Sequence, residues 1–61
     1  MDTRDFQYAV SQIKLLRKYH KEGWHHILSE EKEKLETFLR KRNFILQEDE
    51  NYLYTIKGIA D

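Results

Sequence analysis

The chain has 61 residues, of which 36% are charged, and it contains neither cysteine nor proline. A chain this short supports only one small core, and the lack of cysteine excludes disulfides and thiolate zinc sites. The eleven basic and eleven acidic side chains balance, so net charge indicates neither a nucleic-acid nor a membrane partner. Apolar runs reach three residues, too short for a signal peptide or a membrane span. We therefore expect one domain over residues 1–61, in a reducing, cytoplasmic setting, and the first methionine favours a complete protein.

Residues 5–22 have the spacing of an amphipathic helix that ends at Gly23. Apolar residues three and four positions apart form the predicted core-facing stripe, which consists of Phe6, Ala9, Val10, Ile13 and Leu16. A second apolar facet lies beside that stripe and consists of Tyr8, Leu15 and Tyr19. Two facets are more than one partner helix usually covers. This helix is therefore predicted to be central to the fold or to contact another molecule.

A second helix is predicted over residues 29–42. Ser29 is a good N-cap, because its hydroxyl can accept from the backbone of a first turn that is rich in glutamate. Asn43 is suited to the left-handed position that follows a helix end. The segment from Trp24 to Leu28 is compatible with a turn, a short helix or an edge strand, and we expect a buried connector anchored by its two end residues.

Two β-favouring segments, residues 44–47 and 52–56, flank a polar loop and predict a C-terminal hairpin. Alternation places Tyr52, Tyr54 and Ile56 on one face of the second strand. A lone hairpin is marginal in water, so it must lie on the helices. The sequence thus predicts an α+β fold, with two antiparallel helices covered by a β-hairpin.

Residues 35–58 resemble the C-terminal half of winged-helix domains, in which a helix is followed by the two strands of the wing. The matching residues are Leu39, Asn43, Phe44, Ile45, Thr55, Lys57 and Gly58. The resemblance implies a winged-helix-like fold and a DNA-binding transcriptional regulator. Two features depart from the family pattern: the helix in the recognition position begins with several glutamates, and the loop at 48–50 is acidic where a DNA-touching wing usually carries basic residues.

Basic residues follow one side of the first predicted helix at helical spacing, namely Lys14, Arg17, Lys18 and Lys21. A second basic cluster, Arg40, Lys41 and Arg42, ends the second helix. Helix ends favour cations in any case, and an exposed helix face is commonly charged. If the two helix ends lie together, the clusters form one surface for phosphates or for an acidic protein. This is the predicted nucleic-acid site.

The histidines do not have the spacing of a metal site. His20 and His25 do not share a helix face, and the adjacent His25 and His26 point apart. Ser29 follows His25 by four residues, but N-capping explains it better than a nucleophile does. We therefore expect no metal, no cofactor, no small-molecule substrate and no enzymatic activity.

The chain contains eight aromatic residues, a large share for so polar a sequence. Phe6, Phe38 and Phe44 are predicted core residues, which leaves the tyrosines and the tryptophan for an interface. The predicted protein-binding surface consists of Tyr8, Leu15, Tyr19 and Trp24, with a rim of Lys14, Lys18 and Lys21. The leading hypothesis is a small bacterial or phage regulator or inhibitor that binds a protein or forms a homodimer. The alternative hypothesis is a winged-helix-like DNA-binding protein.

Overall fold

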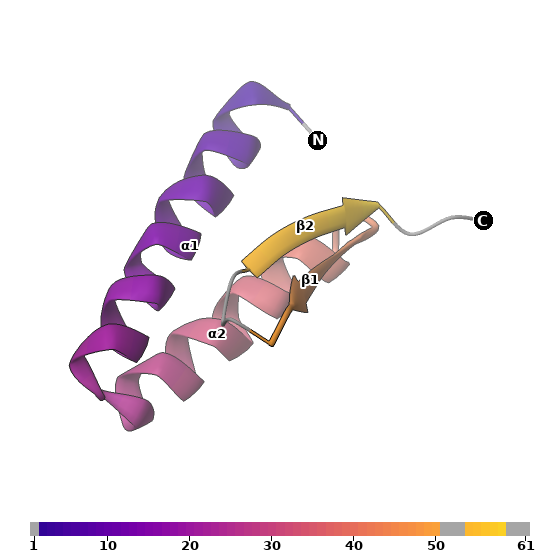
Figure 1. Ribbon diagram of the computed structural model, residues 1–61. Helices are drawn as coiled ribbons and strands as arrows, with labels where there is room; N and C mark the ends of the chain where they lie inside the picture. The colour runs from indigo at the N-terminus through magenta and orange to yellow at the C-terminus, as the bar shows by residue number, and fades with distance from the viewer. Residues whose placement is uncertain (1, 51–53, 59–61) are drawn as a thin grey trace.

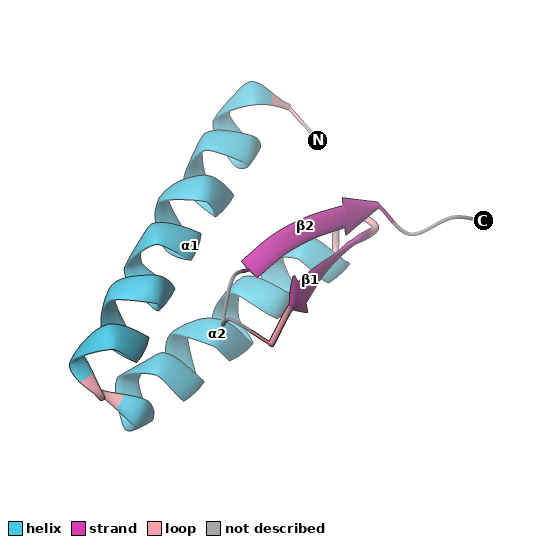
Figure 2. Ribbon diagram, in the orientation of Figure 1, coloured by secondary structure: helices cyan, strands magenta, loops and turns pink. Residues whose placement is uncertain are grey.

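The computed structural model describes residues 2–50 and 54–58, and within them it has two helices followed by a two-stranded antiparallel sheet (Figure 1, Figure 2). In chain order the elements are α1 (Thr3–Glu22), α2 (His25–Arg40), β1 (Phe44–Glu48) and β2 (Tyr54–Gly58). The helices form an antiparallel pair, and the hairpin lies across one side of that pair. The α+β arrangement predicted from the sequence is confirmed.

Helix α1 begins two residues before the predicted start, because Asp2 caps it. The Asp2 carboxylate accepts a 2.8 Å hydrogen bond from the Asp5 backbone N–H. At the other end Gly23 has φ of 76°, as predicted for the stop. The N–H groups of Gly23 and Trp24 donate to the carbonyls of His20 and Tyr19, which is the Schellman pattern of helix termination.

Helix α2 begins at His25, four residues before the predicted start, so the expected connector is wrong. Ser29 lies exposed inside the helix and is not its N-cap. The physical reason is helical phase: extending the helix backward puts Leu28 on the same stripe as Leu35 and Leu39, where it packs against the core. The helix forms without a side-chain cap because burial of that stripe outweighs the missing capping bond.

The end of α2 agrees with the sequence to within two residues. The α-helix ends at Arg40, and residues 41–43 form a turn. Asn43 has φ of 63°, the left-handed conformation predicted for it, and its N–H donates to the Arg40 carbonyl over 3.1 Å. The chain therefore reverses directly into β1.

Strands β1 and β2 pair in antiparallel register from Phe44 opposite Gly58 to Glu48 opposite Tyr54. The second strand runs later than predicted, to Gly58, and the part of the prediction at 52–53 lies outside the described residues. Tyr54 and Ile56 point toward the helices, as the alternation predicted, and Thr55 points away. Strand β1 contacts α2, whereas β2 contacts α1.

The described core lies where the helices meet the hairpin. Its buried residues are Ala9, Leu16, Leu35, Leu39 and Tyr54, and Phe38 and Phe44 are half-buried beside them. Phe6 was also predicted as core, but 52% of it is exposed. The buried part of α1 begins only at Ala9, one turn further along the helix. The Phe6 prediction is therefore wrong.

Candidate protein-binding face

Four large apolar residues on the helices each come directly before a core residue in the sequence. Tyr8 and Leu15 precede the buried Ala9 and Leu16, and the same pattern recurs on α2. There, Ile27 precedes Leu28 and Phe38 precedes Leu39. One residue is a turn of about 100° around a helix. A second apolar stripe therefore runs beside the core stripe on both helices.

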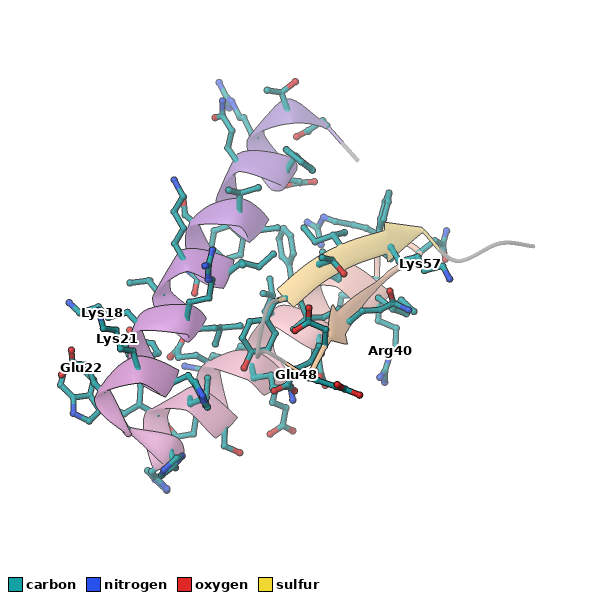
Figure 3. The ribbon with its side chains drawn as sticks, viewed as in Figure 1. Lys18, Lys21, Glu22, Arg40, Glu48 and Lys57 are labelled. Atoms are coloured by element: carbon teal, nitrogen blue, oxygen red, sulfur yellow. The ribbon has the colours of Figure 1, made fainter. Side chains whose placement is uncertain are left out.

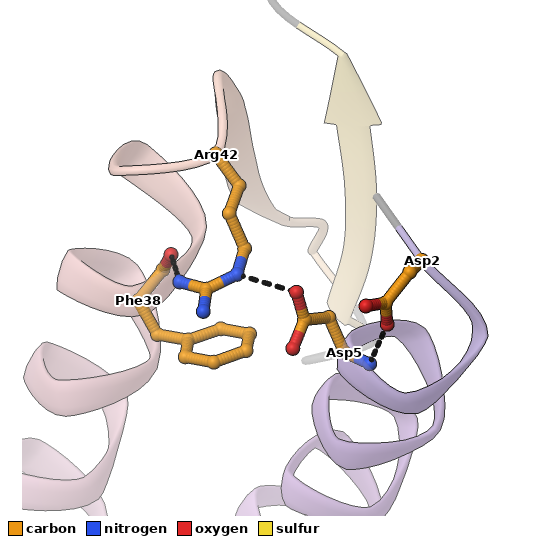
Figure 4. Close-up of polar contacts among 4 residues, drawn as sticks. All are labelled: Asp2, Asp5, Phe38 and Arg42. Atoms are coloured by element: carbon orange, nitrogen blue, oxygen red, sulfur yellow. Dashed lines mark hydrogen bonds and ion pairs between the residues drawn. The ribbon is translucent and has the colours of Figure 1, made fainter.

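The two outer stripes meet on the side of the helix pair that the hairpin does not cover, since Figure 4 shows the Phe38 ring between the helices with the strands behind it. The rings of Tyr8 and Phe38 are in contact, with centroids 4.7 Å apart, so the stripes of α1 and α2 join across the seam between the helices. Tyr8, Leu15 and Ile27 are 45%, 38% and 42% exposed. We call this surface, formed by Tyr8, Leu15, Ile27 and Phe38, the hairpin-free face.

Tyr19 and Trp24, both predicted for the interface, lie at the turn between the helices. Their rings are 5.9 Å apart, and they occupy the two positions that make the usual apolar contact of a Schellman motif. This local contact gives both residues a role in ending α1. Trp24 is nevertheless 46% exposed, so the expectation that it anchors a buried connector is wrong. The pair extends the hairpin-free face at one end.

The flank of α1 beside the hairpin-free face is basic. Lys14, Lys18 and Lys21 are exposed, and Figure 3 shows Lys18 and Lys21 pointing outward from the C-terminal half of α1. Lys18 is the next residue beyond Leu15 on the helical surface, at the i+3 position. Lys18 therefore borders the apolar stripe, and Lys14 and Lys21 lie one turn to either side of it, with the exposed Glu22 next to Lys21.

The flank of α2 beside the same face is mainly acidic. Glu30 is the i+3 neighbour of Ile27, and Glu33 lies further round the helix; both are exposed. A shallow, open depression lies over this flank, lined by Glu30, Glu33, Lys34 and Thr37. Lys34 donates to Glu31 over 3.3 Å, so its charge is partly balanced within the helix. The apolar face thus separates a mainly basic flank from a mainly acidic one.

The structure does not bring the two predicted basic clusters together. The helices are antiparallel, so α1 ends where α2 begins, and the two C-terminal ends lie at opposite ends of the pair. Figure 3 shows Lys18 and Lys21 on one side of the molecule and Arg40 on the other. Arg17 and Lys41 are exposed.

Arg42 is used inside the fold (Figure 4). Its Nε donates to the Asp5 carboxylate over 2.9 Å, and another guanidinium nitrogen donates to the Phe38 carbonyl over 3.0 Å. The guanidinium also lies 3.7 Å from the centre of the Phe38 ring. Arg42 therefore ties the start of α1 to the end of α2.

A further ion pair links α2 to the hairpin. Lys32 Nζ lies 2.6 Å from Glu48 Oε2. The hydrogen bond to Glu48 raises the pKa of Lys32 above its ordinary value, and partial burial opposes that rise only in part. The contact connects the end of β1 to the middle of α2.

No arrangement suited to metal binding is found among residues 2–50 and 54–58: no three histidine or acidic side chains converge there. His26 pairs with Glu30 over 3.2 Å at an exposed position of α2. Neither described helix has the length and apolar character needed to cross a membrane.

Comparisons with protein-family models, with curated proteins and with solved structures find no significant match to this chain. The candidate site therefore rests on the geometry of the chain itself. Sequence reasoning identified Tyr8 and Leu15 but missed Ile27, which it assigned to the connector. The signal that points to Ile27 is its position directly before Leu28, which shares a helical stripe with Leu35.

Proposed function

We propose that this chain is a small, non-enzymatic cytoplasmic protein that regulates or inhibits by binding a protein surface through its hairpin-free face. The observation that carries the proposal is the second apolar stripe, which runs along both helices and joins at the Tyr8–Phe38 contact. Small domains rarely expose a continuous apolar surface without a partner for it. Aromatic residues with charged residues at the rim are typical of interfaces.

The exposed fractions of the apolar side chains support one continuous surface and not a set of isolated apolar residues. Leu15 and Ile27 lie on different helices, are exposed to a similar degree, and flank the same seam. Neither is needed to close the core, which is formed by Leu16, Leu35 and their buried neighbours. The exposed position of these two apolar side chains is explained if a partner covers them.

The test is a pull-down from cell lysate with the tagged full chain, run with and without nuclease. We expect a defined protein to be retained in both conditions, and the double variant Leu15→Ser/Ile27→Ser to lose it. The matched control is Phe6→Ser/Ile45→Ser, which removes two apolar side chains of similar exposure away from the face. Equal retention by both double variants would contradict the proposal.

The nuclease arm also tests the nucleic-acid alternative. Lys14, Arg17, Lys18 and Lys21 are all exposed along α1 and are available to phosphates. If nucleic acid is the partner, binding should fall steeply with salt, because each phosphate contact releases counterions. If nuclease abolishes the retention of partners by the tagged chain, and salt weakens it, the partner is a nucleic acid and not a protein.

A further inference from the structure

The charges beside the hairpin-free face are arranged unequally on the two helices. The exposed rim on α1 is mainly basic, with Lys14 and Lys18, and Glu22 lies at its C-terminal end. The exposed rim on α2 is mainly acidic, with Glu30 and Glu33, because the charge of Lys34 beside them is paired with Glu31 over 3.3 Å. A partner that fits both rims must offer acidic groups to α1 and basic groups to α2. The chain itself offers that combination, because it carries one rim of each sign.

The level of each residue along the helix pair follows from the internal contacts. Tyr8 of α1 contacts Phe38 of α2, and Asp5 contacts Arg42, so moving forward in α1 corresponds to moving backward in α2. By this register Lys18 stands close to the level of Glu30. The lysine and glutamate rims therefore occupy the same stretch of the helix pair.

Two ways of stacking one helix pair on another differ in their charge contacts. If a two-fold axis runs parallel to the helices, α1 of each copy lies on α2 of the other, and Lys14 and Lys18 meet Glu30 and Glu33. If the axis runs across the helices, α1 lies on α1, and lysine meets lysine. Like charges brought together cost free energy, so the first arrangement is favoured.

From this arrangement we propose that the partner of the hairpin-free face is a second copy of this chain. The two copies form a four-helix bundle of two stacked pairs. In it, α1 of each copy lies antiparallel on α2 of the other, and the two hairpins lie on the outside. The apolar stripes of Tyr8, Leu15, Ile27 and Phe38 form the centre, and the lysine and glutamate rims close both sides. This inference rests on the proposed function, for which it names the partner.

The small size of the chain also favours this dimer, because dimerisation buries more apolar surface. Chains of about 60 residues bury only about 60% of their unfolded surface, and oligomerisation is a common way to gain more. In this chain the fully buried described residues are few, and three of the four face residues remain about two-fifths exposed. Pairing the faces converts that exposed surface into core.

The test uses two variants of opposite charge, Lys14→Glu/Lys18→Glu and Glu30→Lys/Glu33→Lys, studied by sedimentation equilibrium over a range of protein concentrations. We expect wild type to dimerise and each variant alone to raise the dimer Kd at least tenfold. An equimolar mixture should recover a dimer, because each acidic rim then faces a basic one. The control Arg40→Glu/Lys57→Glu makes the same charge change at two exposed residues that Figure 3 shows on the opposite side of the molecule from Lys18, and it should dimerise as wild type does.

All the substituted side chains are exposed, so every variant should fold as wild type does, and circular dichroism checks this. Wild type that stays monomeric, or a mixture that forms no heterodimer, would overturn the self-association. The proposed function would then be judged separately: a monomer whose Leu15→Ser/Ile27→Ser variant loses a captured protein retains the binding face with a different partner. A monomer whose capture does not depend on those residues contradicts both.

Discussion

Replacing Arg42 by alanine should destabilise the fold through three contacts at once. The side chain donates to Asp5 on α1 over 2.9 Å and to the Phe38 carbonyl over 3.0 Å, and it lies 3.7 Å from the centre of the Phe38 ring. Both members of the ion pair are part-buried. This is the contact that joins the N-terminal end of α1 to the C-terminal end of α2 (Figure 4).

The expected magnitude follows from those contacts. A part-exposed ion pair contributes about 0.5–1 kcal/mol, a hydrogen bond about 1 kcal/mol, and a cation–π contact about 0.5 kcal/mol. Arg42→Ala should therefore lower the free energy of unfolding by about 2 kcal/mol. A chain of this length has a total stability of about 3–9 kcal/mol, so the loss is a large share of it. Arg42→Lys keeps the charge but loses the planar fork, and should recover at most half.

Urea unfolding followed by circular dichroism measures these differences. The control is Arg40→Ala, which removes an exposed arginine two residues away and should change the free energy of unfolding by less than about 0.5 kcal/mol. A double-mutant cycle with Asp5→Asn should give a coupling of about 0.5–1 kcal/mol. Equal effects of the two arginine substitutions, together with zero coupling to Asp5, would refute the reasoning.

Two further predictions concern the core and the hairpin. Leu39→Ala removes a fully buried side chain and should cost about 2–5 kcal/mol, so that the variant is largely unfolded by circular dichroism at 37 °C; a cooperative wild-type-like melt would contradict the assignment of the core. The Lys32–Glu48 pair should stabilise the fold fully from neutral pH up to about pH 10, because the pKa of Lys32 is raised in the folded state, and its contribution should disappear as pH rises through that pKa. Urea midpoints between pH 8 and 11 should therefore fall further for wild type than for Lys32→Met, and parallel curves would exclude a role for the pair.

Local signals in the sequence predicted the ends of elements where a single residue controls the backbone. Gly23 and Asn43 both adopt positive φ, and both were predicted from the preference of glycine and asparagine for that conformation. The start of α2 was wrong because Ser29 and the glutamates after it form a good cap in isolation. Burial of Leu28 decided the boundary instead, and burial depends on contacts distant in sequence.

The candidate site also has parts that local sequence signals predict and parts that depend on contacts distant in sequence. The direction of Tyr8 and Leu15 on α1 follows from helical periodicity and was predicted. Periodicity does not say which stripes another element covers, so Phe6 was assigned to the core although the buried stretch begins at Ala9. The internal use of Arg42 was equally beyond the sequence, because its partner Asp5 is distant along the chain.

The claim at the centre of this account is that association uses the hairpin-free face. Amide chemical shifts measured by NMR on the full chain at rising protein concentration locate the contact residue by residue. We predict that the shifts that change cluster at Tyr8, Leu15, Ile27 and Phe38, with smaller changes at the adjoining lysine and glutamate rims. Shifts confined to β1 and the groove beside it, which is lined by Glu36, Arg40 and Ile45 among others, or no concentration dependence at all, would contradict the claim.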